Sequence, residues 1–313
     1  MKIALVLGSG GARGYAHIGV IRELERRGHE VVMVSGTSMG ALIGGVYAAG
    51  VLDDVTEYAT SLSTADVRRL ADVTLRAPGL IRLRKAMDKL EEFISDIRIE
   101  ELPIPYVAVA TDINHAREVW FRTGPLIKAI RASIAIPAVF TPVQSGDRLF
   151  VDGGLLNPLP LGPTLDSDAD LIVAVSLFGP SATQRRTTPQ AASADNTSSD
   201  EPATWADRIE ASFADTWAGR QLQQLLDHGD SHPPEQLFSD VATTATVGLP
   251  DITIRALDLM QGQIEIARTA MSTPDVLIRV PVDTCTILEF DRAAEVIDVG
   301  HRLAVEALDA AGL

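Results

Sequence analysis

Residues 31–50 read VVMVSGTSMGALIGGVYAAG, and this stretch decides the fold. Its first part, Val31 to Val34, is a continuous apolar run of the kind that forms a strand buried on both faces. The sequence GTSMG follows, and the apolar run from Ala41 to Gly50 is typical of a buried helix. A buried strand that turns directly into a helix predicts a parallel sheet covered by helices.

The same alternation of strand, loop and helix occurs on both sides of this stretch. Residues 2–7 predict a buried strand, residues 8–14 a glycine-rich loop, and the residues up to about Arg27 a helix with one apolar face. Further along the chain we expect helices over residues 53–100 and 125–133, and strands over 105–111, 148–151 and 171–177. This pattern predicts an α/β fold, a three-layer α/β/α sandwich with a mostly parallel central sheet.

The chain is expected to consist of a core, a linker and a C-terminal part. Residues 1–179 form the predicted core, and residues 180–204 a flexible low-complexity linker, because 181–204 contain no large apolar side chain. Residues 205–313 are expected to form an amphipathic helix from about Trp205, a helix over 251–272, a strand over 276–282 and a helix over 291–311. One strand is too little for a second α/β domain, so this part is expected to complete the first.

Composition and charge exclude several classes of protein. A chain of 313 residues with 46% hydrophobic and 22% charged residues can bury a sizeable core. Its formal net charge of -15 argues against nucleic-acid binding, which needs concentrated positive charge. The single cysteine, Cys285, cannot form an internal disulfide, and no apolar run approaches the roughly 20 residues of a membrane-spanning helix. We therefore expect a cytoplasmic protein.

The sequence GTSMG has the Gly-x-Ser-x-Gly spacing of a nucleophile elbow. In such a turn Ser38 lies between strand and helix with its hydroxyl exposed, and side chains in place of Gly36 and Gly40 would collide with neighbouring backbone. The helix N-terminus behind the serine favours the negative charge that develops during attack. The pattern alone is common by chance, but its strand–turn–helix context indicates a nucleophilic serine.

A serine hydroxyl needs a base to act as a nucleophile near neutral pH. The order serine, acid, histidine of an α/β-hydrolase could be completed by His228, His232 or His301. The elbow follows a single preceding strand, however, which is too early for the sheet of that class. His228 and His232 also lie in a polar stretch and His301 on an amphipathic helix, where a surface or packing role is the simpler interpretation.

Asp152 is the alternative base. It ends a predicted strand, at the edge where parallel sheets place their sites, and two glycines that leave room beside it follow. Its reference pKa of about 3.9 makes it a poor base, so burial or a hydrogen bond that strengthens during attack would have to compensate. Taken alone, the sequence Asp-Gly-Gly would indicate only a turn.

The glycine-rich loop at residues 8–14, GSGGARG, allows two interpretations. It approaches the dinucleotide fingerprint G-x-G-x-x-G, but the sixth position is Arg13, whose side chain would fill the space that the third glycine leaves. No acidic residue ends the second strand either, where a ribose partner would be expected. The loop suits an oxyanion hole better, because the N–H groups of Gly10 and Gly11 can point at a developing oxyanion while Arg13 fixes the loop.

Together these segments resemble the patatin-like phospholipases. Residues 10–14, GGARG, are similar to the family's G-G-x-R-G loop, and residues 36–40 to its G-x-S-x-G elbow. Residues 132–142, ASIAIPAVFTP, resemble a family segment between the two catalytic blocks, and residues 152–154 the family's D-G-G. The likeness is strong over residues 3–178, with Ser9 as a departure where many members have a third glycine.

The resemblance implies a Ser-Asp dyad with no catalytic histidine. Ser38 would attack an ester carbonyl, Asp152 would take the proton, and Gly10 and Gly11 would hold the oxyanion beside Arg13. Family members cleave fatty acyl esters of phospholipids, lysophospholipids or neutral lipids through an acyl-serine intermediate, and the resemblance implies no metal or other cofactor. An acyltransferase or thioesterase on the same dyad, or a non-catalytic lipid-binding regulatory protein, are the alternatives.

Residues 68–89 reverse the overall negative charge locally. Seven basic residues face two acidic ones there, namely Arg68, Arg69, Arg76, Arg82, Arg84, Lys85 and Lys89 against Asp72 and Asp88. With the interleaved Leu75, Leu80, Ile81 and Leu83, this segment could cap an acyl site and contact anionic headgroups at the inner face of a membrane. A solvated pair of helices with its own apolar face is an equally good interpretation. The oligomeric state is open.

Overall fold

The computed structural model describes residues 1–70, 72–73, 81–82, 84–181 and 249–313. Of these, the residues within Met1–Thr187 and Ile252–Leu313 form one unit around a single large sheet. A second unit, Thr188–Asp251, falls almost wholly outside the described ranges. Nearly all of the predicted linker and the predicted helix from Trp205 therefore lie outside the described residues, so the division of the chain stays a prediction.

Eight strands of the described residues form this sheet, in the order β10-β9-β1-β2-β5-β8-β7, with β6 also paired to β5. They are β1 Lys2–Leu7, β2 Glu30–Thr37, β5 Tyr106–Asp112, β6 Arg117–Phe121, β7 Val143–Ser145, β8 Arg148–Asp152, β9 Leu171–Gly179 and β10 Val276–Pro281. The pairs from β10 to β5 are parallel, whereas β6, β7 and β8 pair antiparallel with their neighbours. The predicted mostly parallel central sheet is confirmed.

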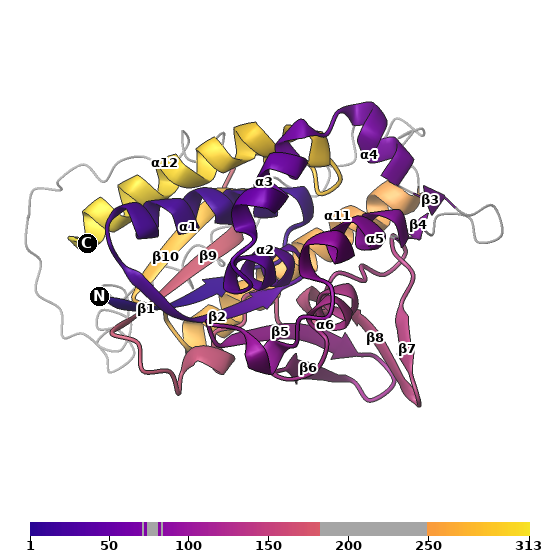
Figure 1. Ribbon diagram of the computed structural model, residues 1–313, viewed down its shortest axis with the longest axis horizontal. Helices are drawn as coiled ribbons and strands as arrows, with labels where there is room; N and C mark the ends of the chain where they lie inside the picture. Colours follow the sequence, from indigo (N-terminus) through magenta and orange to yellow (C-terminus); the bar gives the residue numbers. More distant parts are fainter. Residues whose placement is uncertain (71, 74–80, 83, 182–248) are drawn as a thin grey trace, which may run out of the picture. The chain divides into compact units, whose positions relative to one another are not determined.

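Helices follow the strands in the expected alternation (Figure 1). They are α1 Ala16–Arg26, α2 Met39–Ala48, α3 Leu52–Ser61, α4 Thr64–Leu70, α5 Arg84–Ile94, α6 Leu126–Ser133, α11 Leu249–Met271 and α12 Ala293–Ala311. The prediction of helices throughout residues 53–100 is wrong in one place, because the short strands β3 Asp72–Val73 and β4 Ile81–Arg82 pair between α4 and α5. The sequence between them contains Pro78 and Gly79, which do not favour a helix interior.

The sheet is covered on both faces, as the side chains of β1 demonstrate. Ile3, Leu5 and Leu7 enter the main core, where α1, α2 and α12 pack. Ala4 and Val6 face the opposite side, which is covered by the segment after β8 and by α11. In Figure 1, α1 and α12 lie side by side along the first face. This alternation across a strand is what a three-layer α/β/α fold requires.

The C-terminal elements belong to the same sheet as the N-terminal ones. The strand β10 pairs parallel with β9, and α12 packs along α1. Both Gly19 and Gly300 lie at this helix contact, and a Cβ on Gly300 would lie 2.0 Å from the Ala16 carbonyl oxygen. Within the described ranges, no helix has both the length and the apolar composition needed to cross a membrane.

Candidate active site

Ser38 lies between β2 and α2 in a backbone conformation that few residues adopt. Its φ of 57° and ψ of -122° place a non-glycine residue in a strained region. A Cβ on Gly36 would lie 2.3 Å from the Gly40 carbonyl oxygen, and a Cβ on Gly40 would lie 2.1 Å from the Leu7 carbonyl oxygen. The turn is therefore packed so closely against its neighbours that both flanking positions require glycine.

A second serine holds the strained turn in place. The Ser38 amide donates a hydrogen bond of 2.8 Å to Ser133 Oγ, and that hydroxyl donates one of 2.6 Å to the Val109 carbonyl oxygen on β5. Ser133 ends α6 and is fully buried. The sequence motif around residue 133 carried a family resemblance but no indication of this role, because the contact joins segments that are distant in sequence.

Asp152 lies beside the Ser38 hydroxyl. Ser38 Oγ donates to Asp152 Oδ2 at 2.5 Å, and the Gly154 amide donates to Asp152 Oδ1 at 2.7 Å. Both Ser38 and Asp152 are almost completely buried. Burial raises the pKa of Asp152 to about 7, although the hydrogen bonds from Ser38 and Gly154 lower it. An aspartate with this pKa is a far better proton acceptor than an exposed one.

The sheet brings the two residues together across β5. Thr37 at the end of β2 pairs with Val109, and Asp152 at the end of β8 pairs with Ala110 on the other side of the same strand. The backbone that follows Asp152 packs directly against β5, since a Cβ on Gly153 would lie 2.2 Å from the Val109 carbonyl oxygen. The prediction that Asp152 ends a parallel strand is wrong, because β8 runs antiparallel to β5.

The glycine-rich loop faces the same site. Gly10 and Gly11 have φ values of 156° and 59°; Gly10 caps and Gly11 begins the short 3-10 helix Gly11–Tyr15, whose first amides have no carbonyl partner within the helix. A Cβ on Gly11 would lie 2.4 Å from the Ile287 carbonyl oxygen. The buried Arg13 guanidinium donates to the Gly10 carbonyl oxygen at 3.2 Å and to Asp258 at 2.6 Å. The loop can thus present amides to an anionic oxygen.

Helix α11 crosses this site, a feature that the sequence did not indicate. Besides the ion pair of Asp258 with Arg13, Gln261 Oε1 accepts a hydrogen bond of 2.7 Å from Ser9 Oγ. Further along the helix, Arg268 donates to the Leu156 carbonyl oxygen at 3.1 Å. The sequence predicted this helix over residues 251–272 but gave no signal for its partners.

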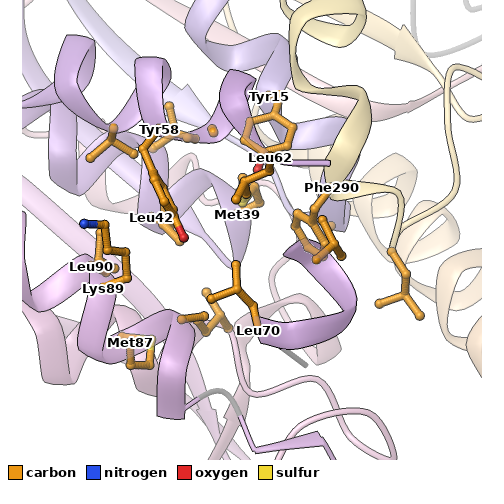
Figure 2. A pocket seen from close by; sticks show the side chains of 18 of the residues that line it. Tyr15, Met39, Leu42, Tyr58, Leu62, Leu70, Met87, Lys89, Leu90 and Phe290 are labelled. Carbon is orange, nitrogen blue, oxygen red and sulfur yellow. The ribbon is translucent and has the colours of Figure 1, made fainter. Parts of the chain in front are cut away.

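Ser38 also lines a large apolar cavity of about 320 Å³. Its walls come from α2, α3, α4, α5 and the segment before α12 (Figure 2). Figure 2 shows Tyr58, Leu62, Leu70, Met87 and Phe290 around this space. Such a lining suits an extended hydrocarbon group better than any polar ligand.

None of the histidines in the described part of the chain is hydrogen-bonded to Ser38 or Asp152. His17 is fully buried, its Nε2 lies 2.9 Å from the Gly8 carbonyl oxygen, and burial lowers its pKa to about 4, which keeps the ring neutral. His301 lies on α12, where its Nδ1 is 3.6 Å from Glu23 Oε2. His228 and His232 lie outside the described residues. Among the described residues, no cluster of three or more His, Cys, Asp and Glu side chains is arranged to hold a metal ion.

The profile of the family described as patatin-like phospholipase matches residues 5–165, about half of the chain. The chain belongs to this family. The matched residues of this patatin-like phospholipase include the glycine-rich loop, Ser38 and Asp152.

Curated relatives extend the match beyond these residues. An uncharacterized NTE family protein of Mycobacterium tuberculosis is 40% identical over 341 residues, covering 99% of this chain and 92% of the relative. The patatin-like phospholipase domain-containing protein 6 of Mus musculus is 32% identical over 182 residues, covering 56% of this chain and 13% of that protein.

Among solved structures, the crystal structure of VipD from Legionella pneumophila aligns with a TM-score of 0.45 and 14% sequence identity. The alignment covers 99% of this chain and 66% of that chain. The assignment to the family rests on the sequence matches alone.

Proposed function

We propose that this patatin-like phospholipase is a serine acyl hydrolase with Ser38 as nucleophile and Asp152 as the only side-chain base. One observation carries the proposal: Ser38 Oγ donates directly to a buried carboxylate at 2.5 Å, and burial raises the pKa of that carboxyl to about 7. A base with a pKa near the working pH is the most effective for proton transfer in the transition state. The family implies lipid acyl hydrolysis in general, and the dyad is the finer proposal.

In the first half of the reaction, Ser38 Oγ attacks the ester carbonyl carbon while its proton moves to Asp152 Oδ2. The carbonyl oxygen becomes an oxyanion, which the amides of Gly10 and Gly11 stabilise by hydrogen bonds. Arg13 helps to hold that loop, since it donates to the Gly10 carbonyl oxygen. The tetrahedral intermediate then expels the alcohol, which takes the proton from Asp152, and leaves an acyl ester on Ser38.

The large cavity beside Ser38 supports a fatty acyl chain as the group that is transferred to the serine. Its lining is nearly all apolar, so transfer of a hydrocarbon chain from water into it is favourable. We therefore propose long-chain acyl esters of (lyso)phospholipids or related lipids as substrates, corresponding to a carboxylic ester hydrolase of class EC 3.1.1.

The test is hydrolysis of p-nitrophenyl acyl esters by the wild type and by Ser38→Ala and Asp152→Asn. Both variants should lose nearly all activity while retaining the wild-type circular dichroism. Ser61→Ala and Asp166→Asn are matched controls, because both residues are exposed, and they should keep full activity. A triple replacement of His228, His232 and His301 should also be active, and its inactivity would point to a histidine base instead.

We also propose that the basic segment 68–89 contacts anionic lipid headgroups. Support comes from α4 and α5, since exposed Arg68 lines the apolar cavity and exposed Lys85 lies at the start of α5. Of the other predicted cap residues, Leu75, Arg76, Leu80 and Leu83 lie outside the described residues. Arg84→Glu with Lys85→Glu, at exposed positions outside the cavity wall, should lower activity on anionic vesicles but not on a soluble ester, and equal loss on both substrates would contradict the proposal.

A further inference from the structure

A second, small hollow of about 20 Å³ adjoins Ser38 and Asp152. Gly10, Gly11 and Gln261 also line it, and the rest of its wall is isoleucine and leucine apart from Asp258, which is paired with Arg13. A cavity needs about 10–15 Å³ to hold one water molecule, and that water needs two to four polar partners. This hollow meets both requirements even when the Gly10 and Gly11 amides bind the carbonyl oxygen of the acyl group, because the Asp152 carboxylate and the Gln261 carboxamide remain as two polar partners for one water.

The Gln261 carboxamide is held in a defined orientation. Its Oε1 accepts from Ser9 Oγ at 2.7 Å, and Ser9 is almost completely buried. With the oxygen engaged in this bond, the Nε2 group is left with its two N–H donors. The carboxamide also lies against the aspartate loop, since a Cβ on Gly154 would be 2.5 Å from Gln261 Oε1. Gly154 in turn donates its amide to Asp152 Oδ1 at 2.7 Å.

The helix that carries Gln261 is fixed to both halves of the site. On the side of the glycine-rich loop, Asp258 forms an ion pair with Arg13 at 2.6 Å, and the Arg13 side chain is only 1% exposed. On the side of the aspartate loop, Arg268 donates to the Leu156 carbonyl oxygen at 3.1 Å and to Glu118 at 3.2 Å. These contacts set the position of Gln261 relative to Ser38 and Asp152.

We propose that Gln261 is the positioning residue for the water that hydrolyses the acyl-enzyme, an inference that rests on the proposed function. The water occupies the small hollow and accepts a hydrogen bond from Gln261 Nε2. It gives one proton to Asp152 while its oxygen attacks the carbonyl carbon of the acyl-Ser38 ester. The intermediate then breaks its bond to Ser38 Oγ, which takes the proton from Asp152, and the carboxylic acid leaves.

Product partition between two nucleophiles tests this role whichever step limits turnover. A p-nitrophenyl ester is supplied with a fixed concentration of hydroxylamine, a strong nucleophile that depends less than water on positioning, and the ratio of hydroxamate to carboxylic acid is measured. Gln261→Met keeps the length of the side chain but removes its donors. The ratio of hydroxamate to carboxylic acid should rise about tenfold in this variant. A change of this size corresponds to the loss of one hydrogen bond at the upper end of the usual range.

Gln263→Met is the matched control, because Gln263 is exposed on the same helix, and it should leave the ratio unchanged. An unchanged ratio in Gln261→Met overturns the inference, even if the overall rate falls, since Gln261 would then support only the glycine-rich loop through Ser9. The proposed function fails separately: the folded wild type would then hydrolyse no ester, or Ser38→Ala would retain its activity. With the wild type active and Ser38→Ala inactive, an unchanged ratio refutes the water-positioning role alone.

Discussion

Replacement of Asp152 by asparagine should stabilise the protein at neutral pH although it abolishes activity. Asp152 is 2% exposed, and burial raises its pKa to about 7, whereas an unfolded chain has an aspartate pKa of about 3.9. A carboxyl whose pKa is higher in the folded state binds more protons there. The contribution of Asp152 to the free energy of unfolding is therefore highest below about pH 4 and falls as the pH rises towards 7. Asparagine does not titrate and lacks this loss.

The expected magnitude follows from the difference of about three pKa units, each worth 1.36 kcal/mol, which gives about 4 kcal/mol. The side-chain oxygen of the introduced asparagine can still accept the Gly154 amide or contact Ser38 Oγ, so the local hydrogen bonds are largely preserved. Urea unfolding of both proteins between pH 4 and pH 8 measures the effect. The stability of the variant minus that of the wild type should rise by about 1.4 kcal/mol per pH unit from about pH 4 to 7 and stay level above.

The difference in unfolding free energy between Asp152→Asn and the wild type isolates the titration of Asp152 from that of other buried carboxyls. Burial also raises the pKa of Glu265 to about 7, but this carboxyl titrates in both proteins and cancels in the difference. Asp166→Asn, at an exposed position, should leave the pH dependence unchanged. A difference between Asp152→Asn and wild type that does not vary with pH would mean that Asp152 has an ordinary pKa, and the argument for it as an effective base would fail.

Four further outcomes are expected. The kcat/KM of the wild type on a soluble ester should fall tenfold per pH unit below about pH 7, because the Asp152 carboxylate is lost as it takes up a proton, and a profile that is flat to pH 5 would contradict this role. Gly40→Ala should prevent folding or destabilise the protein by about 3 kcal/mol or more in denaturant titrations, since its Cβ would lie 2.1 Å from a carbonyl oxygen. Ser133→Ala should lower kcat about tenfold with little change in KM, because the Ser38 amide loses its acceptor. Ala59→Phe, which puts a large side chain in the wall of the acyl cavity, should shift the preferred p-nitrophenyl ester to shorter chains, and an unchanged preference would place the acyl chain elsewhere.

The polar contacts of α11 give the site a rigidity that the loops alone would not have. Ser9 and Leu156 lie in connections between elements and Arg13 in a short 3-10 helix, and each is bonded to α11. A helix is a more precise support than a loop for groups that must remain in place during a reaction. The catalytic machinery proposed for residues 1–179 would thus depend on residues more than 70 positions beyond that core.

The sequence by itself determined the local elements and the type of fold. Apolar runs such as 31–34 and 171–177 mark buried strands, because a strand covered on both faces has no polar side to show. Glycines at positions 36 and 40 mark the elbow, because the sharp turn leaves no room for side chains. These signals are local in the chain, so they can be interpreted without knowing what lies opposite.

Strands with weaker apolar character were not predicted. In β6, Arg117–Phe121 has one charged residue at its start and another next to it, and its side chains are exposed or half-buried. The strand β7, Val143–Ser145, has three residues, too few for an alternating pattern to be recognised. Such strands are stabilised by hydrogen bonds to the neighbouring strand, so their own composition gives little indication that they are strands.

Only the tertiary structure decided which side chains meet. Ser38 and Asp152 are 114 positions apart, and Arg13 and Asp258 are 245 apart. Such contacts depend on the order and direction of strands, and an apolar run has the same pattern whether its strand is parallel or antiparallel. The antiparallel course of β8 and the path of α11 over the site therefore could not be deduced, because hydrophobic burial is non-directional and specifies that a segment is covered without specifying by what.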